Sequence, residues 1–447
     1  MMTLYIIGFV IVFLLVLASG MPVGFGLGFL GMGLLIALSD MDTALGISME
    51  KTYTAMDSSI LVSIPLFVLA AQLIGESGMG KRLFDAAKTF LGKFKAGLGM
   101  ATVTSSALFS AMTGSSFVAA STMGLIAIPE LKRAKYPDFL TSAAITAGGS
   151  LGAVIPPSII LIIYGYLTDE SIGKLFAAGM VPGILLVILY SIGIMLFSGS
   201  IGKETPGVDG QTVLTPSETG VAAPPERVMT KWVATKEAFW GLMAPVIILG
   251  GIYGGIFTAT EAAAVAVIYC TFVGFFIYRT LNIKKLWAIL QASGSVSCMI
   301  AMIVVGGAIL SFPIIYGRIP QQLIELIVAK NFNPWFLLFL INLILFGLGM
   351  FVEILALVYL AIPICYPVVV HMGWDNIWFA IIFLLNVNLA LITPPMGGVL
   401  FIVSQIGGIS LDKVIKGAIL PIVIIIFVLI LIVFFPSIAT WLPTIVE

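Results

Sequence analysis

Long apolar segments alternate with short polar breaks along this chain of 447 residues. About 20 apolar residues are what an α-helix needs to cross the hydrocarbon core of a bilayer. We predict ten such spans, near residues 4–20, 22–39, 59–76, 138–168, 178–198, 238–258, 261–279, 295–312, 374–409 and 418–436. The apolar runs are continuous and do not alternate with polar residues, which excludes a transmembrane β-barrel. The pattern therefore predicts an all-α polytopic membrane protein.

Two further apolar stretches, 97–129 and 334–370, carry small or flexible residues at their centres. The sequence TGSS interrupts the first at 113–116, and GLG interrupts the second at 347–349. Each stretch is long enough for two half-helices. We therefore predict two re-entrant hairpins, each of which enters the membrane and returns to the same side.

Each predicted hairpin is followed by a span with two prolines in its middle. Pro156-Pro157 interrupts span 138–168, and Pro394-Pro395 interrupts span 374–409. Adjacent prolines remove two backbone donors and disfavour helix at the residue before them, so the helix must unwind there. From Gly114 to Pro156 is 42 residues and from Gly349 to Pro394 is 45, so the spacing matches closely in both parts of the chain.

Charge balance hides an uneven distribution of basic residues. The chain has 21 Lys+Arg and 21 Asp+Glu. The span map puts 17 of the 21 basic residues on one side, including those at 81–95 and 132–135 that flank the first hairpin. We assign this side to the cytoplasm, because cytoplasmic loops carry an excess of Lys and Arg. Both chain termini are then predicted to be periplasmic.

The second hairpin is flanked by almost no positive charge and is predicted to open to the opposite side. Matching elements in opposite orientation are typical of an inverted repeat. We predict a first repeat at 1–198 and a second at 237–447. The polar segment 199–236 cannot bury a core and is predicted to be a flexible cytoplasmic linker, to which we assign no role.

Composition excludes several functional classes. Charged residues make up only 9% of the chain and apolar residues 60%. So few polar residues could not cover the surface of a soluble globular protein of this size. The balanced charge gives no indication of a nucleic-acid partner, whereas membrane lipid must surround the spans. His371 is the single histidine, the three cysteines have no CxxC spacing, and no P-loop occurs. We expect no cofactor, no enzymatic activity and no ATP hydrolysis, so an ion gradient must drive any transport.

The interrupted elements supply a candidate site. Unwound backbone at membrane depth is tolerated where it is buried or lines a cavity, and its carbonyls suit Na⁺ while half-helix N-termini favour an anion. For one such element alone, helix packing and simple kinks would be the favoured explanation. Two pairs of a hairpin and a broken span, at matched spacing and in opposite orientation, favour an ion and substrate site. The predicted substrate region comprises Ser116, Ser150, Ser158, Asn388 and Thr393.

At this point the sequence resembles a known family, the large membrane subunit of TRAP (tripartite ATP-independent periplasmic) transporters, over nearly the whole chain. The resemblance rests on GSS at 114–116, GGSLG at 148–152 followed by IPPS at 155–158, TATEA at 258–262, GMFVE at 349–353 and TPPMG at 393–397. It implies sodium-driven uptake of a small organic acid across a bacterial inner membrane by an elevator motion. It also implies two partners, a periplasmic substrate-binding protein and a small Q-type membrane subunit.

The resemblance also implies two sodium sites and no other metal. The first joins the first hairpin to the first broken span, through Ser110, Thr113, Ser115, Ser116, Gly149, Gly152, Ile155 and Pro157. The second joins Gly349 of the other hairpin to Ala390, Thr393 and Met396. Ala390 stands where the family often has glycine, a change that a backbone carbonyl ligand would tolerate.

Several alternatives remain open at this stage. A self-sufficient sodium/carboxylate symporter would have the same architecture without a binding protein. An intramembrane enzyme would need paired aspartates, a Ser–His dyad or a metal cluster, and a channel would need charged rings or filter loops. Glu261 is expected to cap an outer helix start. Glu353 either caps the outgoing half-helix of the second hairpin or contacts the ion region.

Overall fold

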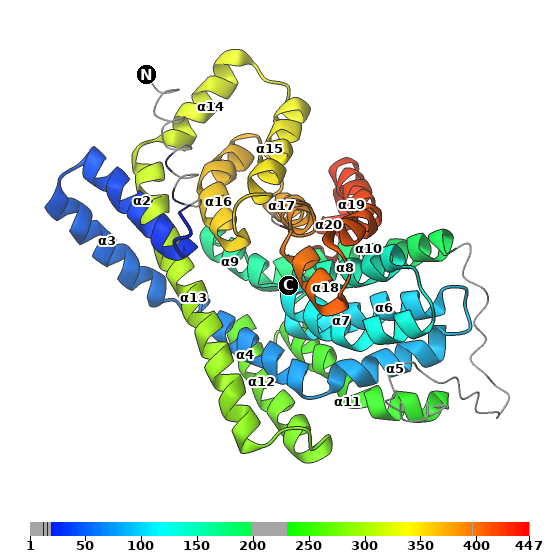
Figure 1. Cartoon of the computed structure of the whole chain (residues 1–447). Helices are drawn as coiled ribbons and strands as arrows, with labels where there is room; N and C mark the ends of the chain where they lie inside the picture. Colours follow the sequence, from blue (N-terminus) through cyan, green and yellow to red (C-terminus); the bar gives the residue numbers. More distant parts are fainter. Residues whose placement is uncertain (1–11, 13–15, 17–18, 199–229, 396, 447) are drawn as a thin grey trace.

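The structure, a computed structural model, describes residues 12, 16, 19–198, 230–395 and 397–446 (Figure 1). Every regular element in these residues is a helix, which confirms the predicted all-α class. Seven helical segments among them are long and apolar enough to cross a membrane: Asp138–Thr168, Ile172–Phe197, Lys231–Tyr253, Ala259–Ile277, Ile283–Tyr316, Ile354–His371 and Leu411–Phe434. Ten crossings remain a prediction. Most of the first predicted span, 4–20, lies outside the described residues, and the helices Val23–Leu38, Ser63–Glu76, Asn376–Leu391 and Gly398–Gly407 are apolar but shorter. One of the seven, Ile354–His371, belongs to the second predicted hairpin.

The described helices before residue 199 begin at Val23. They are α2 (Val23–Leu38), α3 (Met41–Met56), α4 (Ser63–Glu76), α5 (Met79–Leu91), α6 (Gly97–Thr113), α7 (Ser116–Arg133), α8 (Asp138–Val154), α9 (Ile159–Thr168) and α10 (Ile172–Phe197).

The described helices after residue 229 begin at Lys231. They are α11 (Lys231–Tyr253), α12 (Ala259–Phe272) with the π-helical turn η1 (Val273–Ile277), α13 (Ile283–Tyr316), α14 (Ile319–Lys330), α15 (Pro334–Gly349), α16 (Ile354–His371), α17 (Asn376–Leu391), α18 (Gly398–Gly407), α19 (Leu411–Phe434), α20 (Ser437–Thr440) and the 3₁₀ turn η2 (Leu442–Thr444).

Helix lengths recur in the two halves. The pair α6 and α7 has 17 and 18 residues, and the pair α15 and α16 has 16 and 18. The next two helices have 17 and 10 residues in the first half and 16 and 10 in the second. Both series end in a long helix, α10 with 26 residues and α19 with 24.

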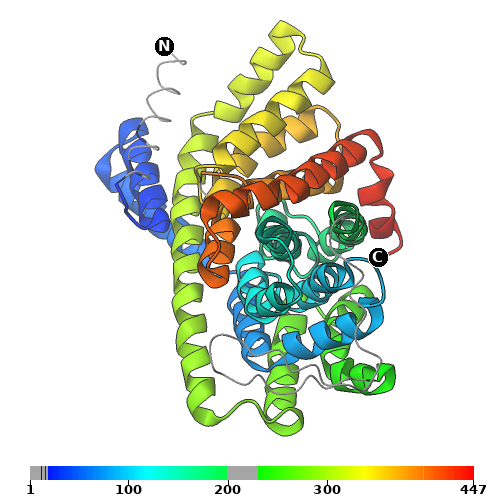
Figure 2. The same ribbon diagram turned by 45° about the vertical axis from the view of Figure 1, so that its right-hand side comes forward.

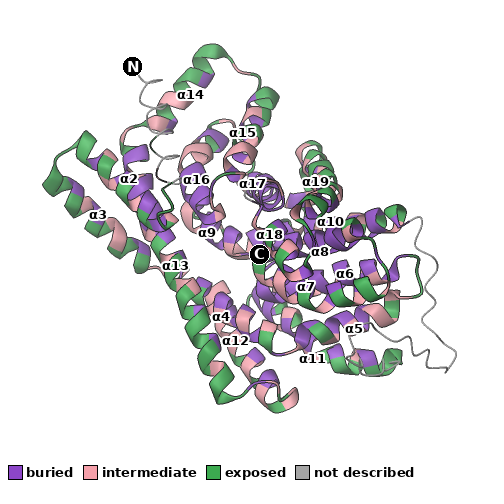
Figure 3. Ribbon diagram, in the orientation of Figure 1, coloured by how far each residue is buried: buried purple, intermediate pink, exposed green. Residues whose placement is uncertain are grey.

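The interrupted helices form the centre of the molecule. Helix α8 packs against α6, α7, α10 and α19, and α17 packs against α15, α19 and α10. Nearly all of α8 and α17 is buried, whereas α3, α14 and the first part of α13 are largely exposed (Figure 3). Helix α13 runs along one edge of the molecule, where α2 packs closely on it (Figure 2). The first break, Ile155 to Ser158, is buried, whereas the second is partly open, with Pro395 exposed.

Two predicted boundaries need correction. Helix α13 has 34 residues, about 51 Å at 1.5 Å per residue, whereas hydropathy predicted only 295–312. Its polar first turns are helical because the Asn282 side chain accepts a hydrogen bond from the Lys285 N–H at 2.8 Å. Helix α11 begins at Lys231, so the end of the predicted linker is helical, while 199–229 lies outside the described residues.

Candidate functional site

The tip of the first hairpin lies directly on the first break. Helix α6 ends at Thr113 and is followed by Gly114, whose φ of 61° is left-handed. Ser115 caps the start of α7 by accepting a hydrogen bond from the Val118 N–H at 3.4 Å. A Cβ at Gly114 would overlap the carbonyl oxygen of Pro157. Glycine is therefore required here both by the backbone conformation and by the close approach of the break.

Two glycines bring α8 against the same tip. A Cβ at Gly152 would lie 2.6–2.7 Å from the backbone of Ser115 and Ser116, and one at Gly149 would lie 2.7 Å from the Ala120 Cβ. The Ser116 hydroxyl donates a hydrogen bond to the Ser150 carbonyl at 3.5 Å. The structure thus brings together the hairpin-tip and α8 residues of the first predicted ion site.

The second half shows a corresponding but more open arrangement. A Cβ at Gly349 would lie 2.7 Å from the Ala390 Cβ, so the second hairpin tip meets α17 near its end. The Thr393 hydroxyl donates to the Leu389 carbonyl at 2.7 Å, and Thr393 remains partly exposed. Of the residues predicted for this site, Met396 lies outside the described residues.

Two half-helix starts from different halves of the chain meet at the centre. A Cβ at Gly398, the first residue of α18, would lie 2.7 Å from the ring of Phe117, the second residue of α7. A Cβ at Gly149 would lie 3.4 Å from Val399. Helix N-termini carry unpaired N–H groups and partial positive charge, so this junction favours an anion.

Three predicted site residues are fully buried and have unpartnered polar atoms. Within the described residues, the hydroxyls of Ser110 and Ser158 and both amide atoms of Asn388 lack a hydrogen-bond partner. Buried polar groups in folded proteins are almost always paired. An ion or polar ligand bound beside the two helix breaks would give these groups partners.

Other predicted residues already have protein partners. The Thr113 hydroxyl donates to the Phe109 carbonyl at 3.2 Å, and the Ser150 hydroxyl donates to the Ala147 carbonyl at 2.8 Å. The Ser150 oxygen also lies 3.1 Å from the Tyr190 hydroxyl. A hydroxyl that donates its hydrogen keeps its oxygen lone pairs, so these side chains could ligate a cation without giving up the bonds that they donate.

Sequence reasoning missed several polar residues near the site. The buried hydroxyls of Ser106 and Thr146 are also unpartnered within the described chain, and the Asn386 amide donates to the Asn342 side-chain oxygen at 2.6 Å between α17 and α15. Asparagine inside an apolar span could have indicated this last pair. Nothing local indicated that Tyr190 of α10 reaches Ser150.

Both glutamates named from the sequence are helix caps. Glu261 and Thr258 form a reciprocal capping box at the start of α12, which confirms the expected role. The Glu353 carboxylate accepts a hydrogen bond from the Ala356 N–H at 3.1 Å, so the capping alternative holds for the second hairpin. His371 is the exposed last residue of α16.

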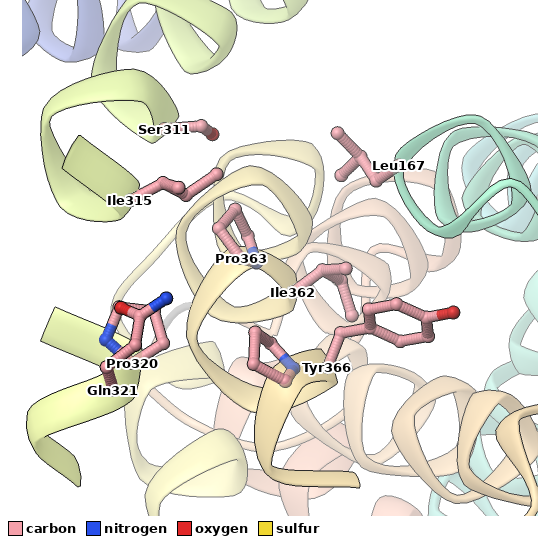
Figure 4. Close-up of a pocket in the computed structure, with 9 residues that line it drawn as sticks. Leu167, Ser311, Ile315, Pro320, Gln321, Ile362, Pro363 and Tyr366 are labelled. Atoms are coloured by element: carbon pink, nitrogen blue, oxygen red, sulfur yellow. The ribbon is translucent and has the colours of Figure 1, made fainter. Parts of the chain in front are cut away.

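A cavity lies away from this junction. It has a volume of about 190 Å³ and lies between α9, α13, α14 and α16 (Figure 4). Its walls are mostly apolar and comprise Leu167, Ser311, Ile315, Pro320, Gln321, Ile362, Pro363, Tyr366 and Pro367. None of these residues belongs to the predicted ion or substrate region, so the candidate site is the central junction and not this cavity.

Comparison with known proteins gives one consistent family. Residues 10–438 match the family model described as "Tripartite ATP-independent periplasmic transporter, DctM component". The chain is 35% identical over 428 residues to the sialic acid TRAP transporter large permease protein SiaM of Vibrio cholerae, covering 96% of each chain. It is 33% identical over 394 residues to the C4-dicarboxylate large permease protein DctM of Pseudomonas aeruginosa, covering 88% of each.

Among solved structures, the fold is similar to that of the YdaH transporter of Alcanivorax borkumensis. The TM-score is 0.56, and the match covers 89% of this chain and 90% of the other. Sequence identity is only 15%, so this likeness concerns the fold alone.

Proposed function

The chain belongs to the DctM-component family of tripartite ATP-independent periplasmic transporters, and from this premise we propose that it takes up a small organic acid by sodium symport. It is a multi-pass membrane transporter and not an enzyme, as its named relatives are transporter permeases. The observation that carries the proposal is the central junction, where a cation-favouring break and anion-favouring helix starts lie within one buried region.

Sodium is the proposed coupling ion. At the first site, the tip of the first hairpin is pressed against α8 and the Pro157 carbonyl, which places several backbone oxygens in one small region. A hard cation such as Na⁺ prefers oxygen ligands. We assign the second sodium to the corresponding contact of Gly349 with Ala390, together with Thr393 and Met396.

The substrate is proposed to be a carboxylate, with its negative charge directed to the starts of α7 and α18. Asn388 and Ser158 are buried and unpartnered, and would supply hydrogen bonds to its polar groups. Sialic acid and C4-dicarboxylates, the substrates named for two relatives, both carry carboxylates. These are the first compounds to test.

The family is defined as one component of a three-part transporter. We therefore propose a periplasmic substrate-binding protein and a small Q-type membrane subunit as partners, with the complex in a bacterial inner membrane. The termini are proposed to face the periplasm, on the basis of the basic-residue distribution.

Alternating access is proposed to occur by an elevator motion of an inverted repeat. The matched helix lengths support the repeat, and so does a reciprocal packing: α9 contacts α16, and α18 contacts α7. Each short half-helix thus lies against the hairpin of the other half. The two hairpins and the two broken helices would move as one unit relative to α2, α4 and α13.

Reconstitution with and without a binding protein separates the two transport hypotheses. We expect liposomes containing the chain and its small subunit to accumulate labelled sialic acid or succinate only when the cognate binding protein is added. Uptake of free substrate at the full rate without that protein would instead establish a self-sufficient symporter.

A further inference from the structure

The last residues of α9, the end away from the Pro156-Pro157 break, are bound by the second half of the chain. Tyr366 of α16 donates a hydrogen bond from its hydroxyl to the Thr168 carbonyl at 3.2 Å. The Asn376 amide, at the start of α17, donates to the Glu170 carboxylate at 2.9 Å. We call these two contacts the α9 tie. In Figure 4 the Tyr366 ring borders the cavity, and its hydroxyl points away from Ser311 and Gln321.

The far end of α18 is bound by the first half of the chain in the same way. Lys132 of α7 donates from its ammonium to the Gly407 carbonyl at 2.5 Å. Lys413, near the start of α19, pairs with Asp138 at 2.7 Å. We call these two contacts the α18 tie.

The two ties occupy equivalent positions in the two halves. Thr168 and Gly407 are the last residues of two helices of equal length, 10 residues. Each is followed by a left-handed residue with φ 57°. Asn376 and Asp138 are likewise the first residues of α17 and α8. The α9 tie and the α18 tie are therefore related by the same correspondence that relates the two halves of the chain. The side chains that form the two ties differ.

The two carbonyl contacts matter more than the ion pair because the acceptor residues Thr168 and Gly407 are buried, although Lys132 itself is exposed. The Lys413 and Asp138 side chains are 58% and 37% exposed, so their ion pair contributes little. The last four carbonyls of a helix have no partner within the helix, and an isolated 10-residue helix is only marginally stable. A donor from the opposite half satisfies such a carbonyl and fixes where the helix ends.

Because α9 and α18 are short, contacts that fix their last residues also fix the position of their first residues. Helix α9 begins beside the first break and α18 begins at the junction with α7, only about 15 Å from their tied ends at 1.5 Å per residue. The position of each half-helix start therefore depends on the opposite half of the chain.

We propose that Tyr366 and Lys132 are positioning residues that couple the two sodium sites. This inference rests on the proposed sodium symport. Binding of Na⁺ at one break orders the half-helix that starts there. Because the last residue of that half-helix is bound by the opposite half of the chain, the opposite half is ordered as well. Loss of either carbonyl contact then makes sodium binding weaker and less cooperative.

The test uses the complete complex in liposomes, with uptake measured against sodium concentration. Lys132→Met removes one donor, and Tyr366→Phe removes one donor together with the acceptor that the Asn376 amide contacts at 3.3 Å. We expect the sodium concentration for half-maximal uptake to rise about two- to tenfold, the range for one hydrogen bond, and the Hill coefficient to fall toward 1. Lys132→Arg retains a donor and should restore both values.

Matched controls come from contacts of the same chemistry outside the broken helices. Tyr269→Phe removes a hydroxyl that donates to the Trp240 carbonyl at 2.7 Å, and Lys285→Met removes an ammonium that donates to the Thr280 carbonyl at 3.1 Å. A purely structural role would lower the maximal rate and the melting temperature without changing the Hill coefficient.

The outcomes separate the two proposals. Sodium-independent uptake by the wild type would contradict the proposed function. A sodium-dependent wild type with a Hill coefficient of 1, or tie variants that behave like Tyr269→Phe and Lys285→Met, would overturn the coupling role and leave the proposed function standing.

Discussion

Gly152 lies where the first hairpin tip crosses α8, and its missing side chain sets the distance between them. A Cβ would lie 2.6–2.7 Å from the backbone of Ser115 and Ser116, closer than van der Waals contact allows. Because the obstructing atoms are backbone, they cannot rotate away. The tip itself would have to move.

Gly152→Ala is therefore expected to weaken sodium binding. Overpacking of this kind costs about 1–3 kcal/mol, and we expect the sodium requirement for uptake to rise roughly tenfold. Gly33→Ala in α2 is the matched control, because a Cβ at Gly33 meets nothing within 4 Å. Both variants gain helix propensity, so only the local clash distinguishes them. An unchanged sodium requirement in Gly152→Ala would remove Gly152 from the ion site.

Asn388 and Asn386 lie two residues apart on α17 and differ in their hydrogen bonding. Both amide atoms of Asn388 are unpartnered within the described residues, whereas Asn386 donates to Asn342 at 2.6 Å. An unpaired buried amide is costly, and we have proposed that the substrate supplies the partner of Asn388. At position 386 the amide serves packing.

Leucine substitutions should separate these two roles. Asn388→Leu is expected to abolish or strongly reduce uptake while keeping the melting temperature unchanged or raised, because an uncompensated polar group is removed. Asn386→Leu is expected to lower stability by about 1–3 kcal/mol, because the Asn342 side-chain oxygen loses its partner while the Asn342 amide still donates to the Leu338 carbonyl. Melting curves and uptake rates measure both. Full uptake by a folded Asn388→Leu protein would exclude Asn388 from the substrate region.

At the scale of elements, helix breaks could be predicted and contacts between distant helices could not. The structure has interruptions at Gly114, Pro156-Pro157 and Pro394-Pro395 because glycine and proline act on the local backbone. The partners of Ser150 and Asn386 lie 40 and 44 residues away in the chain, and the Lys132 contact spans 275 residues. Such pairs depend on tertiary packing, which no local pattern encodes.

The contact between α13 and α16 is where an elevator motion should be visible. The Ser311 hydroxyl of α13 donates to the Tyr359 carbonyl of α16 at 3.1 Å. A Cβ at Gly307 would lie 2.6 Å from the Tyr359 Cβ. Disulfides need about 3.5–4.5 Å between Cβ atoms, which a small relaxation provides once the tyrosine ring is removed.

A disulfide across this contact should stop transport. We expect Gly307→Cys with Tyr359→Cys, in a background in which Cys270, Cys298 and Cys365 are replaced by alanine, to lose uptake on oxidation. Reduction should restore it, so the reduced protein is its own control. Full uptake by protein shown to be crosslinked would contradict relative movement of α13 and α16.

At the scale of the whole molecule, the basic-residue asymmetry predicts which surfaces face the cytoplasm. Lys284 and Lys416 are assigned to the inner side, and Glu50 and Lys330 to the outer side; all four are exposed. We expect single cysteines at 50 and 330 to react with an impermeant maleimide in spheroplasts. Cysteines at 284 and 416 should react only after permeabilisation, and the reverse pattern would invert the proposed orientation.

Composition and periodicity predicted the class and the central elements of the molecule, whereas the extent of α13 required the structure. Its first turns carry lysines and a glutamine, so hydropathy alone does not include them in a span. The Asn282 side chain nevertheless caps a helix that begins at Ile283. The separate helix α14 was missed for a similar reason, because its 12 residues are too few for a span.

The central claim is that a sodium gradient drives uptake through the junction of the two halves. The most direct measurement is substrate accumulation in liposomes that contain the complex and its binding protein, with an inward gradient of Na⁺ or of K⁺ as the only variable. We predict accumulation above equilibrium with Na⁺ that collapses when a sodium ionophore is added, and none with K⁺. Equal accumulation with either cation, unaffected by the ionophore, would contradict the account.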